Sequence, residues 1–200
     1  MIDIEKNKKR FLQVANDMIK RPGIENLLKW VEKSDFFMAP ASTKYHLAVE
    51  GGLCQHSLHV YDRLQKEVVA EYGYESPYSD ETIALVSLFH DVCKIGVYKT
   101  EMRNVKNQDT GRWEQVPYYT FDDSLPAGHG EKSMYILNSF MHLTREESMA
   151  VLWHMGGFDA RVKGGDYSCS KAFAMFPLAI LLHAADLKAT ALDENGEEGN

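Results

Sequence analysis

Histidines and aspartates on the inward faces of separate predicted helices are the side chains of this 200-residue chain whose types and spacing could do chemistry. His56 stands three residues after Leu53 and four before Val60, so it lies on the apolar stripe of its helix. A comparable spacing from apolar residues puts further groups on the inward faces of three other predicted helices: His90 with Asp91 beside it, His154, and Asp186. Four predicted helices therefore direct an imidazole or a carboxylate towards the interior.

Buried imidazoles and carboxylates each need a partner, because an unpaired polar group is costly away from water. For any one of these residues alone, the ordinary interpretation is a core side chain that hydrogen-bonds a carbonyl group. For the whole set, one or two divalent cations would satisfy every member. Neutral imidazole and carboxylate suit Fe, Mn, Zn, Ni and Cu, and oxygen-rich positions also accept Mg or Mn. The spacing therefore predicts a metal centre whose ligands converge from positions far apart in the sequence.

The elements that must position these groups are predicted to be almost all helical. Apolar periodicity predicts helices over 3–20, 24–33, 53–72, 79–94, 128–142 and 145–155, and a last helix after residue 170 that Pro177 either kinks or restarts. Strand-forming residues on either side of a turn signal at 107–111 predict a β-hairpin near residues 97–121. We expect an all-α helical bundle with this hairpin inserted, in one domain over 1–200. Residues 1–34 are expected to form an N-terminal helical extension, and 193–200 a solvated, disordered tail.

Charge and cysteine content limit the classes of partner and compartment. The net charge is −7, from 22 basic and 29 acidic residues, which disfavours long nucleic acid as a partner because such binding depends on Lys and Arg. Three widely spaced cysteines without a CxxC pair predict neither a disulfide framework nor a zinc ribbon. No apolar run is long enough to cross a bilayer, and the first residues do not resemble a signal peptide. We therefore expect a cytoplasmic protein without a membrane partner.

Three stretches of the sequence resemble the motifs of the HD-domain metal-dependent phosphohydrolases. Residues 88–95 (LFHDVCKI) resemble that superfamily's signature, an apolar helix that ends in His-Asp-x-x-Lys. Residues 46–58 (HLAVEGGLCQHSL) resemble the stretch with its first histidine, in the form found in a branch that includes 3′–5′ exoribonucleases. Residues 184–189 (AADLKA) resemble its closing aspartate motif. The resemblance runs from residue 45 to residue 191, in the order H…HD…H…H…D.

The resemblance implies an HD-domain helical bundle with a metal centre. His56, His90, Asp91 and Asp186 would hold the first metal, and Asp91 would bridge to a second metal held by His129 and His154. A site with one metal is expected if His129 turns away. The resemblance also implies hydrolysis of a phosphoester, of a nucleotide or another small phosphorylated substrate, by a metal-activated water that Asp91 positions. Neither the native metal (Fe, Mn, Mg, Zn or Ni) nor the oligomeric state follows from it.

Several basic residues are candidates for holding the substrate. Lys94 follows Asp91 by three residues, so its ammonium group could bind a phosphate oxygen in catalysis or simply favour the end of its helix. Other candidate substrate contacts, each of which could instead be an ordinary surface or core group, are His46, Arg103, Arg161 and Lys163. His59 stands three residues after His56 and could lean towards the pocket, but we expect it to be partly exposed. Substrate choice is expected to lie in the loops 35–52, 97–121 and 158–170.

Three other functions stay open at this point. Some proteins of the HD fold use the same histidines and aspartates to hold two irons that activate dioxygen, which makes a di-iron oxygenase the main alternative. A 3′–5′ exonuclease-like phosphodiesterase is another, although only two predicted helices precede the motifs here, where the exoribonuclease branch carries an OB-type domain. The last is a binding or regulatory domain that keeps a metal for structure.

Overall fold

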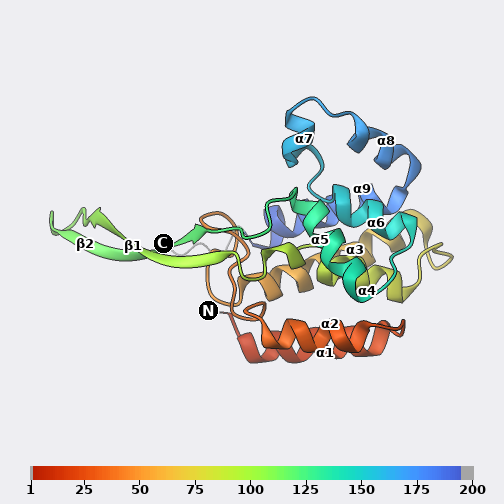
Figure 1. Ribbon diagram of the computed structural model, residues 1–200, viewed down its shortest axis with the longest axis horizontal. Helices are drawn as coiled ribbons and strands as arrows, with labels where there is room; N and C mark the ends of the chain where they lie inside the picture. Colours follow the sequence, from red (N-terminus) through yellow and green to blue (C-terminus); the bar gives the residue numbers. More distant parts are fainter. Residues whose placement is uncertain (1, 195–200) are drawn as a thin grey trace.

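Helices dominate the protein, and one β-hairpin projects from them in the computed structural model, which describes residues 2–194 (Figure 1). The helices are α1 (Ile4–Met18), α2 (Ile24–Lys33), α3 (Gly52–Tyr72), α4 (Asp80–Phe89), α5 (His129–Phe140), α6 (Arg145–Trp153), α7 (Ala160–Lys163), α8 (Ser168–Met175) and α9 (Pro177–Lys188). Short 3-10 turns cover Val92–Lys94 and Gly156–Phe158, and a π-helical turn covers Ala189–Asp193. The prediction of a mainly helical chain with one hairpin is confirmed.

Local sequence signals explain where several helices begin. The side chain of Ser79 accepts a hydrogen bond from the backbone N–H of Thr82 at the start of α4. Thr144 and Glu147 form a reciprocal capping box at the start of α6. Pro177 is the first residue of α9, which suits a residue that has no N–H to donate. The predicted last helix is therefore two helices, α8 and α9, separated at Phe176.

One predicted boundary is wrong in a way that matters for the site. The helix expected to continue to residue 94 ends at Phe89, with His90 as its cap, because the backbone of Asp91 (φ −102°, ψ 17°) leaves the helical region. The chain then turns through the 3-10 segment Val92–Lys94. His90 and Asp91 consequently lie at the end of α4, where the chain changes direction.

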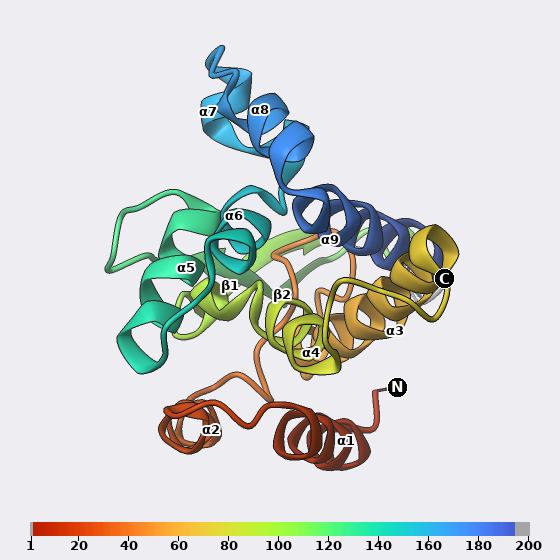
Figure 2. The ribbon, with the colours of Figure 1, turned by 90° about the vertical axis from the view of Figure 1, so that its right-hand side faces the viewer.

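The helices α3, α4, α6 and α9 form the centre of the molecule. Helix α3 lies against α4 and α9, and α6 lies against α9 and α5. Figure 2 shows α1 and α2 together along one side of this centre and α7 and α8 on the opposite side. Phe11 of α1 is fully buried and its ring packs on those of Phe36, Phe37 and Phe89, at centroid distances of 4.9 to 5.6 Å. The expected N-terminal extension therefore shares the main core.

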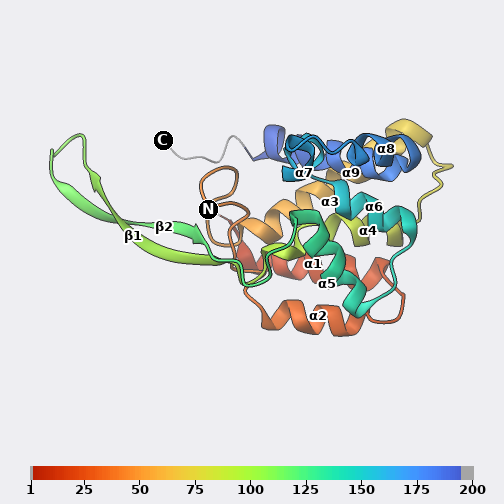
Figure 3. The ribbon, with the colours of Figure 1, turned by 45° about the horizontal axis from the view of Figure 1, so that its top comes forward.

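The hairpin consists of β1 (Tyr98–Lys106) and β2 (Trp113–Phe121), paired antiparallel with Tyr98 opposite Phe121 and Lys106 opposite Trp113. It extends away from the helices, so that its tip lies far from them (Figure 3). At its base the hydroxyl of Tyr98 donates to the carbonyl of Ala41, 3.1 Å away. The hairpin thus starts beside the loop that connects α2 and α3.

The end of the described chain departs from the predicted tail. Both carboxylates there have partners: Asp193 pairs with Arg63, at 2.8 Å between Oδ2 and Nε, and Glu194 is only 1% exposed, against His56 and His59. The expectation of a solvated tail is therefore wrong for these two residues, because their charges are compensated by the protein. The other residues of the predicted tail, 195–200, lie outside the part of the chain that the structure describes.

Within residues 2–194, no single helix combines the length and apolar composition needed to cross a membrane. The segments Ser168–Met175 and Pro177–Asp193 meet that test only as a pair, and they are bent by 109° relative to each other.

Candidate metal centre

Five helices or helix ends bring the predicted metal ligands together. His56 lies in the second turn of α3, and His129 is the first residue of α5. His90 and His154 are the residues that follow the last turns of α4 and α6, and Asp186 lies in α9. His56, His90, Asp91 and His154 are each no more than 2% exposed. The predicted convergence of these six residues is what the structure shows.

The backbone fixes which nitrogen of two rings faces the cluster. Nδ1 of His90 lies 2.8 Å from the carbonyl oxygen of Ser87, and Nδ1 of His154 lies 2.6 Å from that of Val151. A carbonyl oxygen can only accept, so each Nδ1 carries its proton and donates it. Each Nε2 is therefore left with a lone pair, and both lone pairs belong to the cluster.

Asp91 stands between two sets of imidazoles. Its Oδ2 atom lies 3.6 Å from Nε2 of His56 and 3.4 Å from Nε2 of His90. Its Oδ1 atom lies 2.6 Å from Nε2 of His129 and 3.5 Å from Nε2 of His154. Asp186 closes the first set, with Oδ1 3.2 Å from Nε2 of His56. One carboxylate thus presents a different oxygen to each set, which is the arrangement expected of a bridging ligand.

These residues fit divalent cations. Nε2 of His154 is buried without a hydrogen-bond partner among residues 2–194, and a buried polar atom in that state calls for an explanation. Nε2 of His90 faces Nε2 of His56 at 3.3 Å and, because its own proton is on Nδ1, can accept only the proton that His56 carries. Potential ligand atoms lie within 4.8 Å of one another in the groups His56–His90–Asp91, Asp91–His129–His154 and His90–His154–Asp186. The donor set of imidazole nitrogens and carboxylate oxygens is suited to Fe, Mn, Zn or Ni.

The two carboxylates of the cluster and His129 are in the protonation states that bind cations. Burial raises the pKa of Asp91, but the ammonium group of Lys94 and the surrounding imidazoles together outweigh it, so the pKa lies well below its usual value. Burial also raises the pKa of Asp186, but the hydrogen bond with His56 and the electrostatic effect of His56, His90 and His154 together outweigh it, so this pKa is lowered as well. Burial lowers the pKa of His129, and Asp91 offsets this only in part. The cluster therefore holds two ionised carboxylates and a neutral His129, the protonation states that metal ligands require.

His56 is held from both sides by carboxylates. Burial lowers the pKa of His56, but the hydrogen bonds with Asp186 at Nε2 and with Glu194 at Nδ1 have the larger effect together. They raise this pKa to about 10. Without a cation His56 is therefore protonated at neutral pH, and a cation that binds at Nε2 must displace that proton.

Lys94 lies inside the cluster. Its Nζ atom is 2.7 Å from Oδ2 of Asp91, and its side chain is 14% exposed. Burial lowers its pKa, but Asp91 raises it above the usual value, so the ammonium group keeps its charge. Lys94 therefore adds a permanent positive charge at the same carboxylate that the imidazoles surround.

His46 lies beside the cluster rather than in it. Its ring centroid is 4.9 Å from that of His56, and burial together with the charges of His56 and Lys94 lowers its pKa to about 4. Nε2 of His46 is buried and makes no hydrogen bond within the described part of the chain. His46 is thus a neutral imidazole with a free nitrogen next to a candidate ligand.

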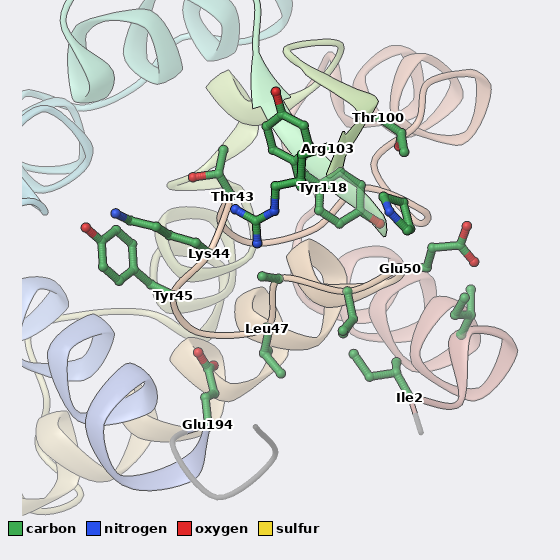
Figure 4. A pocket seen from close by; sticks show the side chains of 15 residues that line it. Ile2, Thr43, Lys44, Tyr45, Leu47, Glu50, Thr100, Arg103, Tyr118 and Glu194 are labelled. Atoms are coloured by element: carbon green, nitrogen blue, oxygen red, sulfur yellow. The ribbon is translucent and has the colours of Figure 1, made fainter. Parts of the chain in front are cut away.

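A cleft of about 1080 Å³ lies between the loop 43–50 and the hairpin (Figure 4). The loop 43–50 forms one wall with Lys44 and Tyr45, and the hairpin forms the other with Arg103 and Tyr118. Glu194, the partner of His56, lines the cleft as well. The cleft therefore reaches to within one residue of the candidate metal ligands. Of the predicted substrate contacts, Arg103 lies in this cleft.

The other two predicted substrate contacts have partners elsewhere. The guanidinium of Arg161 pairs with Asp159 at 3.0 Å and with Glu131 at 2.5 Å, and it lies 4.1 Å from the ring centroid of Trp153. The ammonium group of Lys163 lies 5.8 Å from the ring centroid of Phe158. The structure gives both residues roles in α7 and its surroundings and places neither in the cleft.

Two residues near the ligands were not predicted from the sequence. Glu194 was assigned to the solvated tail, yet it contacts His56 and His59 at 3.0 Å. Cys93 lies with Sγ 3.5 Å from Nδ1 of His129, and burial raises the pKa of its thiol to about 12. The sequence around Glu194 and Cys93 does not predict these contacts, because each contact joins segments that are far apart in the sequence.

Comparison with protein-family models, curated proteins and solved structures found no match.

Proposed function

We propose that this protein is a metal-dependent hydrolase of the HD-domain type that cleaves a phosphoester of a nucleotide or another small phosphorylated molecule. The observation that carries the proposal is the position of Asp91, with one oxygen towards His56 and His90 and the other towards His129 and His154. The order of these residues in the sequence, which resembles that of HD-domain phosphohydrolases, supports the same conclusion.

The chain offers ligands for two cations. His56, His90, Asp91 and Asp186 would hold one, and Asp91, His129 and His154 would hold the other. When bound, divalent cations supply the acidification of water and the neutralisation of phosphoryl charge that phosphoester hydrolysis needs. Asp91, which is kept ionised by its neighbours, serves as a ligand and not as an acid.

Lys94 favours an anionic substrate. Its ammonium group is held at Asp91, where it can bind an anionic oxygen of the substrate and stabilise charge that develops there. A fixed positive charge at this position suits a phosphoryl group better than neutral dioxygen. Lys94 is thus the residue that favours hydrolase over oxygenase chemistry.

The cleft supplies a place for the rest of the substrate. Lys44 and Arg103 bring positive charge, and Tyr45 and Tyr118 bring aromatic surface that a planar group can stack on. Solvent reaches the cluster along His129, whose side chain is 29% exposed, and Asp186, whose side chain is 17% exposed. A small phosphorylated molecule can therefore approach the ligands without unfolding the bundle.

The test begins with protein purified without chelator. Its metal content is measured, and release of inorganic phosphate from a panel of nucleotides and simple phosphoesters is followed with Mn, Fe, Zn, Ni or Mg. We expect phosphate release that EDTA abolishes and that Asp91→Ala removes. Lys163→Ala is the matched control, because Lys163 lies on Phe158, and it is expected to keep the parent activity. Oxygen consumption by the iron-loaded protein without phosphate release would refute the proposal.

A further inference from the structure

We propose that Glu194 is a positioning residue that orients His56 for cation binding. This inference rests on the proposed function, because it concerns a ligand of the proposed metal centre. Glu194 is 1% exposed, and its carboxylate meets Nδ1 of His56 at 3.0 Å (Oε1) and 3.2 Å (Oε2). A carboxylate can only accept here, so Nδ1 of His56 donates and the Nε2 atom is the one left for a cation.

The last segment of the described chain holds both nitrogens of the His56 ring. Asp186 of α9 lies 3.2 Å from Nε2, on the cluster side, and Glu194 binds Nδ1, on the opposite side. Between them the chain passes through the π-helical turn Ala189–Asp193. The ring of His56 is thus fixed in rotation by two carboxylates from one continuous segment.

His59 fixes the carboxylate of Glu194 in turn. It follows His56 by three residues on the same helix α3, and its Nδ1 atom lies 3.0 Å from Oε1 of Glu194. Two neighbouring imidazoles of one helix therefore converge on one carboxylate. This contact also explains why His59 is only a quarter exposed, with 25% of its side-chain surface accessible.

Asp193 anchors the segment by a separate contact. Its carboxylate forms a two-pronged ion pair with Arg63, one helical turn further along α3 from His59. Asp193 docks the segment on α3 without touching His56, whereas Glu194 does touch it. Asp193 therefore holds the segment on α3 and Glu194 orients the ring of His56, so the two roles can be tested by separate substitutions.

Carboxylates that accept the second N–H of a metal-bound histidine set its tautomer and ring orientation, and their loss typically weakens metal binding 10- to 100-fold. The experiment uses the full chain loaded with Co²⁺ and measures the metal content per chain and the rate at which cobalt is lost to excess EDTA. In metal-free protein a proton competes with cobalt for Nε2 of His56. The release rate starts from the cobalt-loaded protein and therefore does not depend on this competition. We expect Glu194→Gln to keep the parent cobalt content and to release cobalt about tenfold faster.

Asp193→Asn is the matched control, since it removes the neighbouring ion pair and leaves His56 and Glu194 intact. We expect its release rate to match that of the parent. Glu194→Ala, which also removes the hydrogen-bond acceptor, is expected to release cobalt at least as fast as Glu194→Gln. Thermal unfolding of each metal-free variant verifies that it is folded.

Several results would overturn the inference. Release from Glu194→Gln at the parent rate would show that the carboxylate does not orient the ring. Equal acceleration by Asp193→Asn would assign the effect to docking of the segment. A loss of one cobalt per chain in Glu194→Gln would make Glu194 a ligand together with His46 and His56. Parent protein that binds no cobalt would refute the metal centre itself, whereas the first three results leave it standing.

Discussion

The ammonium nitrogen of Lys94 lies 2.7 Å from Oδ2 of Asp91, in the 3-10 turn that follows α4. The same oxygen faces His56 and His90, so a permanent cation and two candidate metal ligands share one carboxylate. In a metal-loaded protein Asp91 would bind the cations, and the ammonium group of Lys94 would be free to bind an anion of the substrate. Under the proposed function, the Asp91–Lys94 pair would join the candidate metal ligands to the group that binds the substrate anion.

The first prediction concerns this lysine. Lys94→Met removes the charge but keeps much of the volume, and we expect it to lower kcat for phosphate release about 100-fold while the metal content stays at the parent value. Steady-state kinetics together with elemental analysis check it. A kcat equal to that of the parent would show that Lys94 only stabilises the end of its helix. Loss of metal would show that Lys94 is needed for the ligands to bind the cation.

The number of metals per chain gives a second prediction. Because His129 and His154 face Oδ1 of Asp91 and His56 and His90 face Oδ2, His154→Ala should lose one of two cations, whereas Asp91→Ala should lose both. Elemental analysis of the purified variants measures this directly. Parent protein with one metal, unaffected by His154→Ala, would contradict a binuclear centre.

A third prediction is the pH dependence of stability in the metal-free protein. The pKa of His56 is raised to about 10, so its contribution is fully present below its unfolded pKa of about 6.5 and is lost as the pH rises through about 10. The pKa of Glu194 is lowered to about 2, since hydrogen bonds with His56 and His59 outweigh burial, so its contribution is present above about 4.3 and is lost as the pH falls. The free energy of unfolding should therefore decline between about pH 6.5 and pH 10.

Urea unfolding of EDTA-treated protein at a series of pH values measures that decline. His56→Ala is the comparison, and its profile should be flatter over the same alkaline range. A parent profile that stays level up to about pH 10 would contradict the ion pairs assigned to His56.

The fourth prediction concerns the N-terminal helices. Phe11 is fully buried against Phe36, Phe37 and Phe89, so Phe11→Ala should lower the free energy of unfolding by about 3–5 kcal/mol. Urea denaturation checks it. Tyr74→Ala is the control, because Tyr74 is fully exposed and its loss should change stability by less than about 0.5 kcal/mol. A similar small effect for Phe11→Ala would mean that residues 1–34 are a separable extension.

Periodicity was sufficient to predict much of this arrangement. The positions of His56, His90 and His154 relative to apolar neighbours predicted that they point inward, and the structure brings them together. Spacing could not show that His90 and His154 cap their helices, because the helix ends depend on where the backbone turns. That turn leaves Nδ1 of each ring close to a carbonyl of its own helix.

The environment of charged residues was harder to predict. Arg161 and Glu194 both lie in polar stretches that read as solvated, and a sequence does not reveal which partner a surface charge will find. Arg161 is committed to Asp159 and Glu131, whereas Glu194 reaches the buried ring of His56. Each pairing depends on how distant segments pack, information that neither local propensity nor apolar spacing contains.

The hairpin is attached to the rest of the protein at its base and not at its tip. Its base is fastened by the Tyr98 hydroxyl on Ala41 and by the backbone N–H of Asp122 on Val97, whereas the turn at Asn107 is stabilised by contacts within the hairpin itself. A two-stranded ribbon is marginally stable in water by itself, so opening should begin at the far end and proceed towards the body. Amide hydrogens will accordingly exchange with deuterium in a gradient along the two strands, fastest beside Lys106 and Trp113 and slowest beside Tyr98 and Phe121.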